Sequence, residues 1–128
     1  RLPGAHTPII VDGVDIDAVI EAHRRWKVTL RQAIEDRSQV DAATLSRDDC
    51  CALGKWIYGD GQRLSARPTF ESLVTKHAQF HRVAGQVGEL INQRQMRQAE
   101  DALAPGTPFS NATSEVAKEL STAKRLGF

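Results

Sequence analysis

The sequence lacks long apolar runs and any excess of charge of one sign. The longest uninterrupted apolar stretches span only a few residues, as at positions 9–11, which is too short to cross a bilayer. Lysine and arginine number 17 against 16 aspartate and glutamate, for a formal net charge of +1. No large electrostatic field therefore draws the chain to nucleic acid or anionic lipid. These absences exclude a membrane-spanning protein and disfavour both binding classes.

The sequence also lacks cysteines spaced for disulfide bonds. Its two cysteines, Cys50 and Cys51, are neighbours, and adjacent residues are poorly placed to cross-link a fold. A secreted disulfide scaffold is therefore disfavoured, and no secretory signal opens the sequence. We expect a reducing compartment and a cytoplasmic location.

The remaining composition is that of an ordinary soluble globular domain. The 128 residues are 41% hydrophobic and 26% charged, which suits one domain with one hydrophobic core. Residues 1–14 contain two prolines and two glycines and show no helical period, so they are interpreted as an N-terminal arm or linker. His6 lies in this arm and is expected to be solvated. The helical domain is expected over residues 15–128.

Helical periodicity begins immediately after the arm. Asp15 or a neighbouring aspartate can cap a first helix, which is interrupted over 36–44. Ser46 followed by Asp49 resembles a capping box and predicts a second, shorter helix through Ile57. The apolar stripe of the first helix consists of Ile16, Val19, Ile20, Trp26, Leu30, Ala33 and Ile34.

The second half of the chain is predicted to be helical as well. Pro68 suits the first turn of a long third helix that extends to about Ile91. A short helical segment follows over 95–104, and a last helix runs from about Phe109 to Ala123. No β pattern competes with these helices. We therefore predict an all-α fold, an antiparallel four-helix bundle with an additional short helix.

Three histidines fall on the inward faces of these helices. His77 and His81 are four residues apart, so both imidazoles lie on one helix face. They continue the apolar stripe of the third helix, and His23 continues that of the first. Buried imidazoles need polar partners. The alternative interpretation of each is an ordinary core histidine, bonded to a backbone carbonyl or part of a polar seam.

The cysteine pair lies one turn before Trp56 in the predicted second helix, where one of the two thiols must face the core. Three nitrogens and one thiolate suit a tetrahedral zinc ion in the core of a bundle. Regular helical geometry would separate the two cysteine side chains by about 100°, so both could hardly bind one ion. The alternative for the inward thiol is a small buried hydrophobe. Spacing alone leaves open which cysteine is the ligand.

Three motifs occur in order along the chain: His23 with Trp26, the segment Cys51-Ala52-Leu53-Gly54-Lys55-Trp56, and His77 with His81. In these ordered motifs the chain resembles the chemoreceptor zinc-binding domain, a bacterial regulatory module. The similarity runs from about Asp15 to the last helix. It implies a four-helix bundle whose zinc is held by His23, Cys51, His77 and His81, and it selects Cys51 over Cys50, which is then interpreted as packing. It also implies that the domain often forms a homodimer and is attached to a methyl-accepting chemotaxis protein or a diguanylate cyclase.

The expected function is regulatory rather than catalytic. Four protein ligands leave zinc no open position for a substrate water, which argues against an enzyme. Either free zinc is the signal, or an oxidant such as hypochlorous acid attacks the zinc-bound sulfur of Cys51. The alternative is a permanent zinc staple in a dimerisation module without a sensing role.

Overall fold

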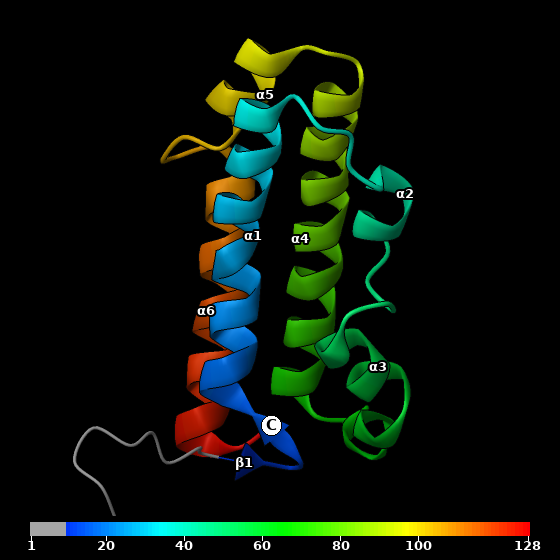
Figure 1. The fold of residues 1–128 in the computed structure, drawn as a ribbon. Coiled ribbons are helices and arrows are strands. Elements are labelled where there is room, and N and C mark those ends of the chain that lie inside the picture. The colour runs from blue at the N-terminus through cyan, green and yellow to red at the C-terminus, as the bar shows by residue number, and fades with distance from the viewer. Residues whose placement is uncertain (1–9) are drawn as a thin grey trace, which may run out of the picture.

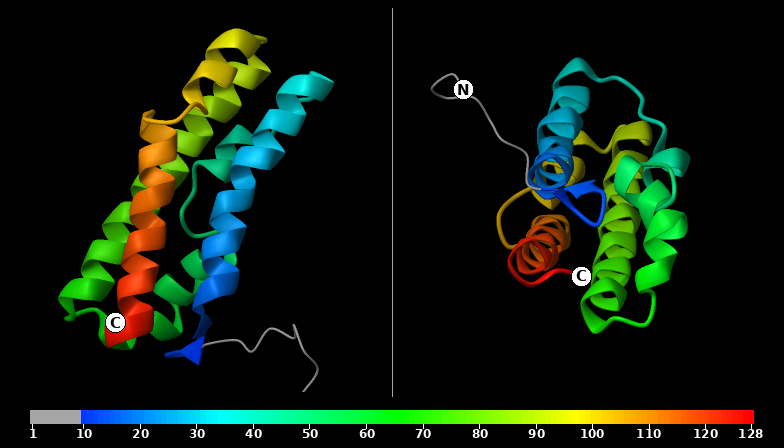
Figure 2. Two further views of the ribbon diagram at one scale, coloured as in Figure 1. Left: turned by 90° about the vertical axis from the view of Figure 1, so that its left-hand side faces the viewer. Right: turned by 90° about the horizontal axis from the view of Figure 1, so that it is seen from below.

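A computed structural model describes residues 10–128 and shows three long helices lying side by side (Figure 1). These are α1 (Ile16–Asp36), α4 (Pro68–Asn92) and α6 (Pro108–Leu126). Each of the three packs against the other two, and Figure 2 shows the group end-on. The prediction of a mostly helical fold is confirmed.

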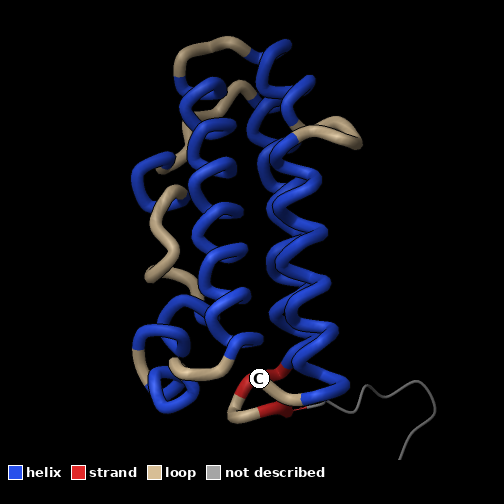
Figure 3. The backbone as a smooth tube through the Cα atoms, turned by 180° about the vertical axis from the view of Figure 1, so that it is seen from behind, coloured by secondary structure: helices blue, strands red, loops and turns tan. Residues whose placement is uncertain are grey.

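Shorter elements connect the long helices. The chain returns from α1 along the outer side of α4 through α2 (Ala42–Leu45), an irregular loop, α3 (Ala52–Tyr58) and the 3₁₀ helix η1 (Asp60–Leu64) (Figure 3). α5 (Met96–Ala102) leads from α4 to α6. The predicted second main helix is thus replaced by short helices and loop. The four-helix arrangement is not confirmed in that form.

The long helices begin and end where local sequence favours it. The side chain of Asp15 accepts a hydrogen bond from the backbone N–H of Ala18 and caps α1, and Arg37 ends this helix in the left-handed conformation. Pro68 lies in the first turn of α4. Thr107 caps α6. The predicted starts of the first, third and last helices are thus confirmed.

The predicted capping box at Ser46 and Asp49 is wrong. Ser46 ends α2, and Asp49 forms an ion pair with Arg47. α3 begins later, and its N-cap is the sulfur of Cys51, which accepts a hydrogen bond from the N–H of Gly54. The carboxylate of Asp49 is bound by the guanidinium group, so it does not cap a helix.

A short β-hairpin, which was not predicted from the sequence, precedes α1. It pairs β1 (Ile10–Val11) with β2 (Val14–Asp15) around Asp12 and Gly13. Both turn residues have positive φ, 50° and 85°, the geometry that an Asp-Gly turn favours. The hairpin covers the last part of the predicted arm. The rest of that arm, residues 1–9 with His6, lies outside the described residues.

One tryptophan joins distant parts of the chain, among them the hairpin and the C-terminal segment, which lie at the lower end of Figure 1. The indole N–H of Trp56 in α3 donates to the carbonyl oxygen of Asp12 at 3.0 Å. Its ring lies 4.9 Å from the ring of Phe128 and 5.7 Å from that of Phe70, measured between centroids. The hairpin, the start of α4 and the segment after α6 therefore meet at Trp56.

The core lies between the three long helices and beneath α3. No helix in residues 10–128 is both long and apolar enough to cross a membrane. The large core side chains that are almost fully buried are Ile16, Leu30, Leu53, Ile57, Leu73, Phe80, Val87, Ile91, Leu103, Phe109 and Leu120.

Candidate metal centre

The fold brings the four predicted site residues into one cluster. His23 comes from α1, His77 and His81 from successive turns of α4, and Cys51 from the N-cap of α3. One potential ligand atom from each residue lies within 4.8 Å of the other three. The three histidines are buried, and Cys51 is half-buried. The cluster therefore ties together segments that are distant in sequence.

The distances between these atoms suit a tetrahedral zinc ion. His77 Nε2 lies 3.1 Å from His81 Nε2 and 3.2 Å from Cys51 Sγ, and Cys51 Sγ lies 3.5 Å from His81 Nε2. Tetrahedral coordination at ordinary zinc bond lengths separates two nitrogens by about 3.3 Å and a nitrogen from a sulfur by about 3.6 Å. A single cation can therefore be shared by these atoms with little adjustment.

Two histidines are oriented by backbone carbonyls. His23 Nδ1–H donates to the oxygen of Val19 at 2.8 Å, and His81 Nδ1–H donates to the oxygen of Leu45 at 2.9 Å. Because a carbonyl oxygen only accepts, Nδ1 of each ring must carry the proton, which leaves Nε2 with a free lone pair. Carbonyl-bonded imidazoles of this kind are typical metal ligands.

Two buried ring nitrogens have no hydrogen-bond partner among the described residues: His23 Nε2 and His77 Nδ1. An unpaired buried nitrogen is costly, and a metal ion would satisfy His23 Nε2. Zinc bound at His77 Nε2 would not satisfy His77 Nδ1, and nothing in the described structure explains that atom. The alternative of core histidines bonded to backbone carbonyls describes the Nδ1 atoms of His23 and His81, but it leaves His23 Nε2 without a partner.

Cys51 is positioned differently from the sequence prediction. It is not inside a helix: its backbone is extended, with φ −80° and ψ 167°, so the predicted separation of about 100° around a helix does not apply. Its sulfur accepts the Gly54 N–H at 3.4 Å. Burial raises the pKa of the Cys51 thiol, and this N–H acts in the opposite direction.

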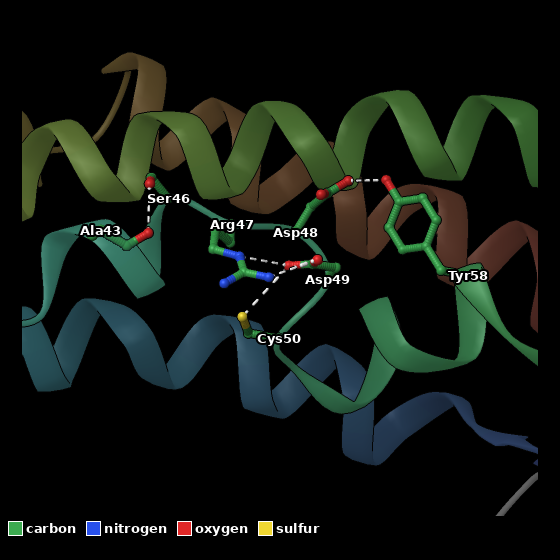
Figure 4. Close-up of polar contacts among 7 residues, drawn as sticks. All are labelled: Ala43, Ser46, Arg47, Asp48, Asp49, Cys50 and Tyr58. Atoms are coloured by element: carbon green, nitrogen blue, oxygen red, sulfur yellow. Dashed lines mark hydrogen bonds and ion pairs between the residues drawn. The ribbon is translucent and has the colours of Figure 1, made fainter.

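Cys50 lies outside the four-residue cluster. Its thiol points to Asp49, with Cys50 Sγ 3.5 Å from Asp49 Oδ1, and the same carboxylate receives two hydrogen bonds from Arg47 (Figure 4). Tyr58 donates to the neighbouring Asp48 at 2.5 Å. Polar contacts of the loop thus hold Cys50 away from the histidines.

The segment from Leu45 to Cys51 is attached to the centre at both of its ends. The carbonyl of Leu45 orients His81, and the sulfur of Cys51 approaches His77 and His81. The role of Leu45 could not be predicted from the sequence, because every residue type has a backbone carbonyl and none signals this use of it. We call residues 45–51 the ligand loop.

Two glycines of α4 let α2 and the start of the ligand loop approach closely. A Cβ added at Gly85 would lie 2.5 Å from Cβ and 2.9 Å from Cα of Ser46. A Cβ at Gly88 would lie farther from its neighbours, 3.0 Å from Cγ2 of the rotatable Val40 side chain and 3.3 Å from Cβ of Ala42 in α2. The absence of a side chain at Gly85 therefore sets the distance between α4 and the carbonyl that orients His81.

Gly85→Ala is expected to destabilise the domain by about 1–3 kcal/mol, the usual cost of overpacking, and to weaken metal binding although Gly85 is no ligand. Gly88→Ala is the matched control. Its clash is softer and is offset by about 1 kcal/mol of helix propensity, so it should be nearly neutral. Urea unfolding measures the stability of both variants, and metal titration measures their affinity for the metal. Equal effects would contradict the close-approach argument.

Acid is expected to destabilise the metal-free protein. Burial, together with the charges of His81 and His23, lowers the pKa of His77 from 6.5 to about 3. Burial also lowers the pKa values of His23 and His81. The unfolded chain therefore binds more protons than the folded chain below about pH 6.5. The stability conferred by neutral histidines is complete above that pH and is lost progressively toward pH 3.

The test is a series of urea midpoints of metal-free protein between pH 7.5 and pH 4, for wild type and His77→Gln. The wild-type midpoint should fall with pH, and the slope should be smaller in the variant. A wild-type midpoint independent of pH would contradict the buried, neutral state of these rings.

Comparison with known proteins agrees with this geometry. The family model of the chemoreceptor zinc-binding domain matches residues 23–87, which is just over half of the chain. The matched segment starts at His23 and contains the other three cluster residues. No curated protein and no solved structure matches the chain significantly. With the cluster as a single site, the expectation of a zinc cofactor is confirmed, and the chain belongs to the chemoreceptor zinc-binding domain family.

Proposed function

We propose that this zinc-binding domain is a regulatory module that holds one Zn²⁺ through Nε2 of His23, His77 and His81 and Sγ of Cys51. The observation that carries the proposal is the approach of these four side chains within 4.8 Å, from two long helices and the ligand loop. Occupancy of such a site couples the packing of the three segments to the state of the ligands.

The ligand set argues against catalysis. Four protein ligands complete a tetrahedral shell and leave no position for a reacting water. When bound, zinc would stabilise Cys51 as a thiolate, against the effect of burial on its pKa. His23 and His81 are fixed in orientation by Val19 and Leu45, so they keep the geometry of the site while the sulfur changes.

Oxidation of Cys51 is the favoured signal. Cys51 is half-buried, whereas the three histidines are buried, so the sulfur is the ligand that a reagent from solvent reaches. A sulfenic acid is a much poorer ligand than a thiolate. Loss of the sulfur would release one end of the ligand loop, while the histidines on α1 and α4 stay in place. Free zinc as the signal is the second candidate.

We also propose that the domain works as a homodimer in the cytoplasm, with its output in a methyl-accepting chemotaxis protein or diguanylate cyclase, in the same or a partner polypeptide. These partners are supported by the family resemblance. The alternative is a zinc staple whose dimerisation rests on apolar residues left over on α6, without a sensing role. The one large apolar side chain exposed on the described α6 is Leu126, which gives that alternative little support.

One equivalent of oxidant is expected to release zinc from the loaded protein in step with modification of Cys51. A chromogenic chelator measures the zinc released, and peptide mass spectrometry measures the modification of Cys51.

A second experiment, titration against a competing chelator, separates the two candidate signals. Zinc affinity near the free cytoplasmic zinc level favours metal sensing, and much tighter binding favours the oxidant. In the oxidant experiment, oxidation of Cys51 without zinc release would contradict the redox proposal.

A further inference from the structure

A cavity of about 230 Å³ lies beside the metal centre. Cys51 and His81 line one part of it, and Trp26, Val40 and Leu45 contribute apolar walls. Thr44 of α2, an exposed residue, also borders it. The cavity therefore connects an exposed part of α2 with the half-buried sulfur of the cluster.

The cavity is poorly suited to ions. The wall area it presents is mostly apolar. Its two charged lining residues are of opposite sign, Asp41 and Arg47, and the guanidinium of Arg47 is already bonded to Asp49 at 3.0 Å. An anion that entered would lose its hydration among apolar side chains without gaining a free side-chain cation as partner, which is unfavourable. A small uncharged molecule has no such penalty.

We propose that this cavity is the entry site for small uncharged electrophiles and oxidants that react at Cys51, and that it discriminates against anions of the same size. The inference rests on the proposed function of Cys51 as the reactive ligand and adds the route and the selectivity. The specificity-determining residues are those of the apolar wall, Trp26, Val40 and Leu45, with Thr44 at the edge.

For a neutral peroxide the reaction at this site balances as follows. The Cys51 thiolate attacks one peroxide oxygen, an S–O bond forms and the O–O bond breaks. The sulfur is oxidised by two electrons to a sulfenic acid, and the second oxygen leaves as hydroxide. With iodoacetamide, used as a probe, the sulfur forms an S–C bond and iodide leaves.

The test compares iodoacetamide with iodoacetate, which is nearly the same size but anionic. It uses the Cys50→Ala background, because Cys50 also borders the cavity and the chain has two cysteines. Alkylation rates of Cys51 are measured by mass spectrometry for the folded protein and for the same chain in denaturant. The ratio in denaturant corrects for the intrinsic reactivity of the two reagents.

We expect the neutral-to-anionic rate ratio to be about tenfold or more higher in the folded protein than in denaturant, because the carboxylate must be desolvated. Thr44→Phe should fill the edge of the cavity and slow iodoacetamide several-fold. Ala43→Phe is the control, since Ala43 is an exposed neighbour on the same helix that does not border the cavity. Urea midpoints verify that both variants fold.

Equal ratios in the folded and unfolded chain would overturn the inference, as would equal rates in folded Thr44→Phe and Ala43→Phe. The ratio is measured separately in zinc-free and zinc-loaded protein, because Zn²⁺ bound by one thiolate and three neutral histidines would place a net charge of +1 beside the cavity. A chain that binds no zinc would therefore overturn the proposed function, while the selectivity of the cavity is decided separately by the ratio.

Discussion

Cys51→Ala is expected to leave far less than one zinc per purified chain, whereas Cys50→Ala keeps about one. Cys51 Sγ lies 3.2 Å and 3.5 Å from the nearest nitrogens of His77 and His81, but Cys50 Sγ lies against Asp49. Removal of a direct ligand should lower zinc affinity by at least about a hundredfold, the upper range for residues that only orient a ligand.

Elemental analysis of protein purified without added metal measures the zinc content, and titration against a chelator measures the affinity. The two variants form a matched pair, because the same substitution is made at adjacent residues. Equal zinc loss in both would show that the ligand is misassigned. Full zinc content in Cys51→Ala would show that the histidines bind without the sulfur.

Gly54→Ala is expected to cause the largest loss of stability among the substitutions at residues that bind no metal. A Cβ at Gly54 would lie 1.9 Å from the carbonyl oxygen and 2.8 Å from the carbonyl carbon of Asp48. Backbone atoms cannot rotate away, so the ligand loop must shift. We expect about 3 kcal/mol or more of destabilisation and weaker zinc binding, because the Gly54 N–H also bonds to Cys51 Sγ.

Lys55→Ala is the control for this prediction, since Lys55 is the exposed next residue of the same short helix. Its thermal midpoint and zinc affinity should stay close to those of the wild type. A Gly54→Ala protein with wild-type midpoint and affinity would show that the loop adapts to a side chain there. The contact between Gly54 and Asp48 would then not explain the glycine of the Cys-x-Leu-Gly-x-Trp segment.

The long helices and the inward histidines could be predicted because periodicity is a local property. The stripe through Phe70 and Leu73 placed His77 and His81 on the buried face, and the structure gives 0% and 3% exposure for these histidines. The apolar stripe of the first helix predicted in the same way that His23 is buried, and its side chain is 4% exposed. A 3.6-residue period needs no knowledge of the packing partner.

The ligand loop could not be predicted in the same way. Ser46 and Asp49 matched a helix start, but Ser46 packs on Gly85, far along the chain, and Asp49 is bound by Arg47. Tertiary contacts thus determine the conformation of the loop. The hairpin was a different case, because Asp12-Gly13 is a recognisable turn signal that the absence of a longer β pattern obscured.

The contacts of Trp56 link α3, which Cys51 caps, to residues near both ends of the described domain. Cys51 caps the seven-residue helix that carries this indole, and the indole holds the hairpin through Asp12 and packs on Phe128. A rotation of α3 that follows loss of the sulfur would therefore displace residues at both ends together. Through these contacts α3 would transmit a change at Cys51 to the hairpin and to the end of α6.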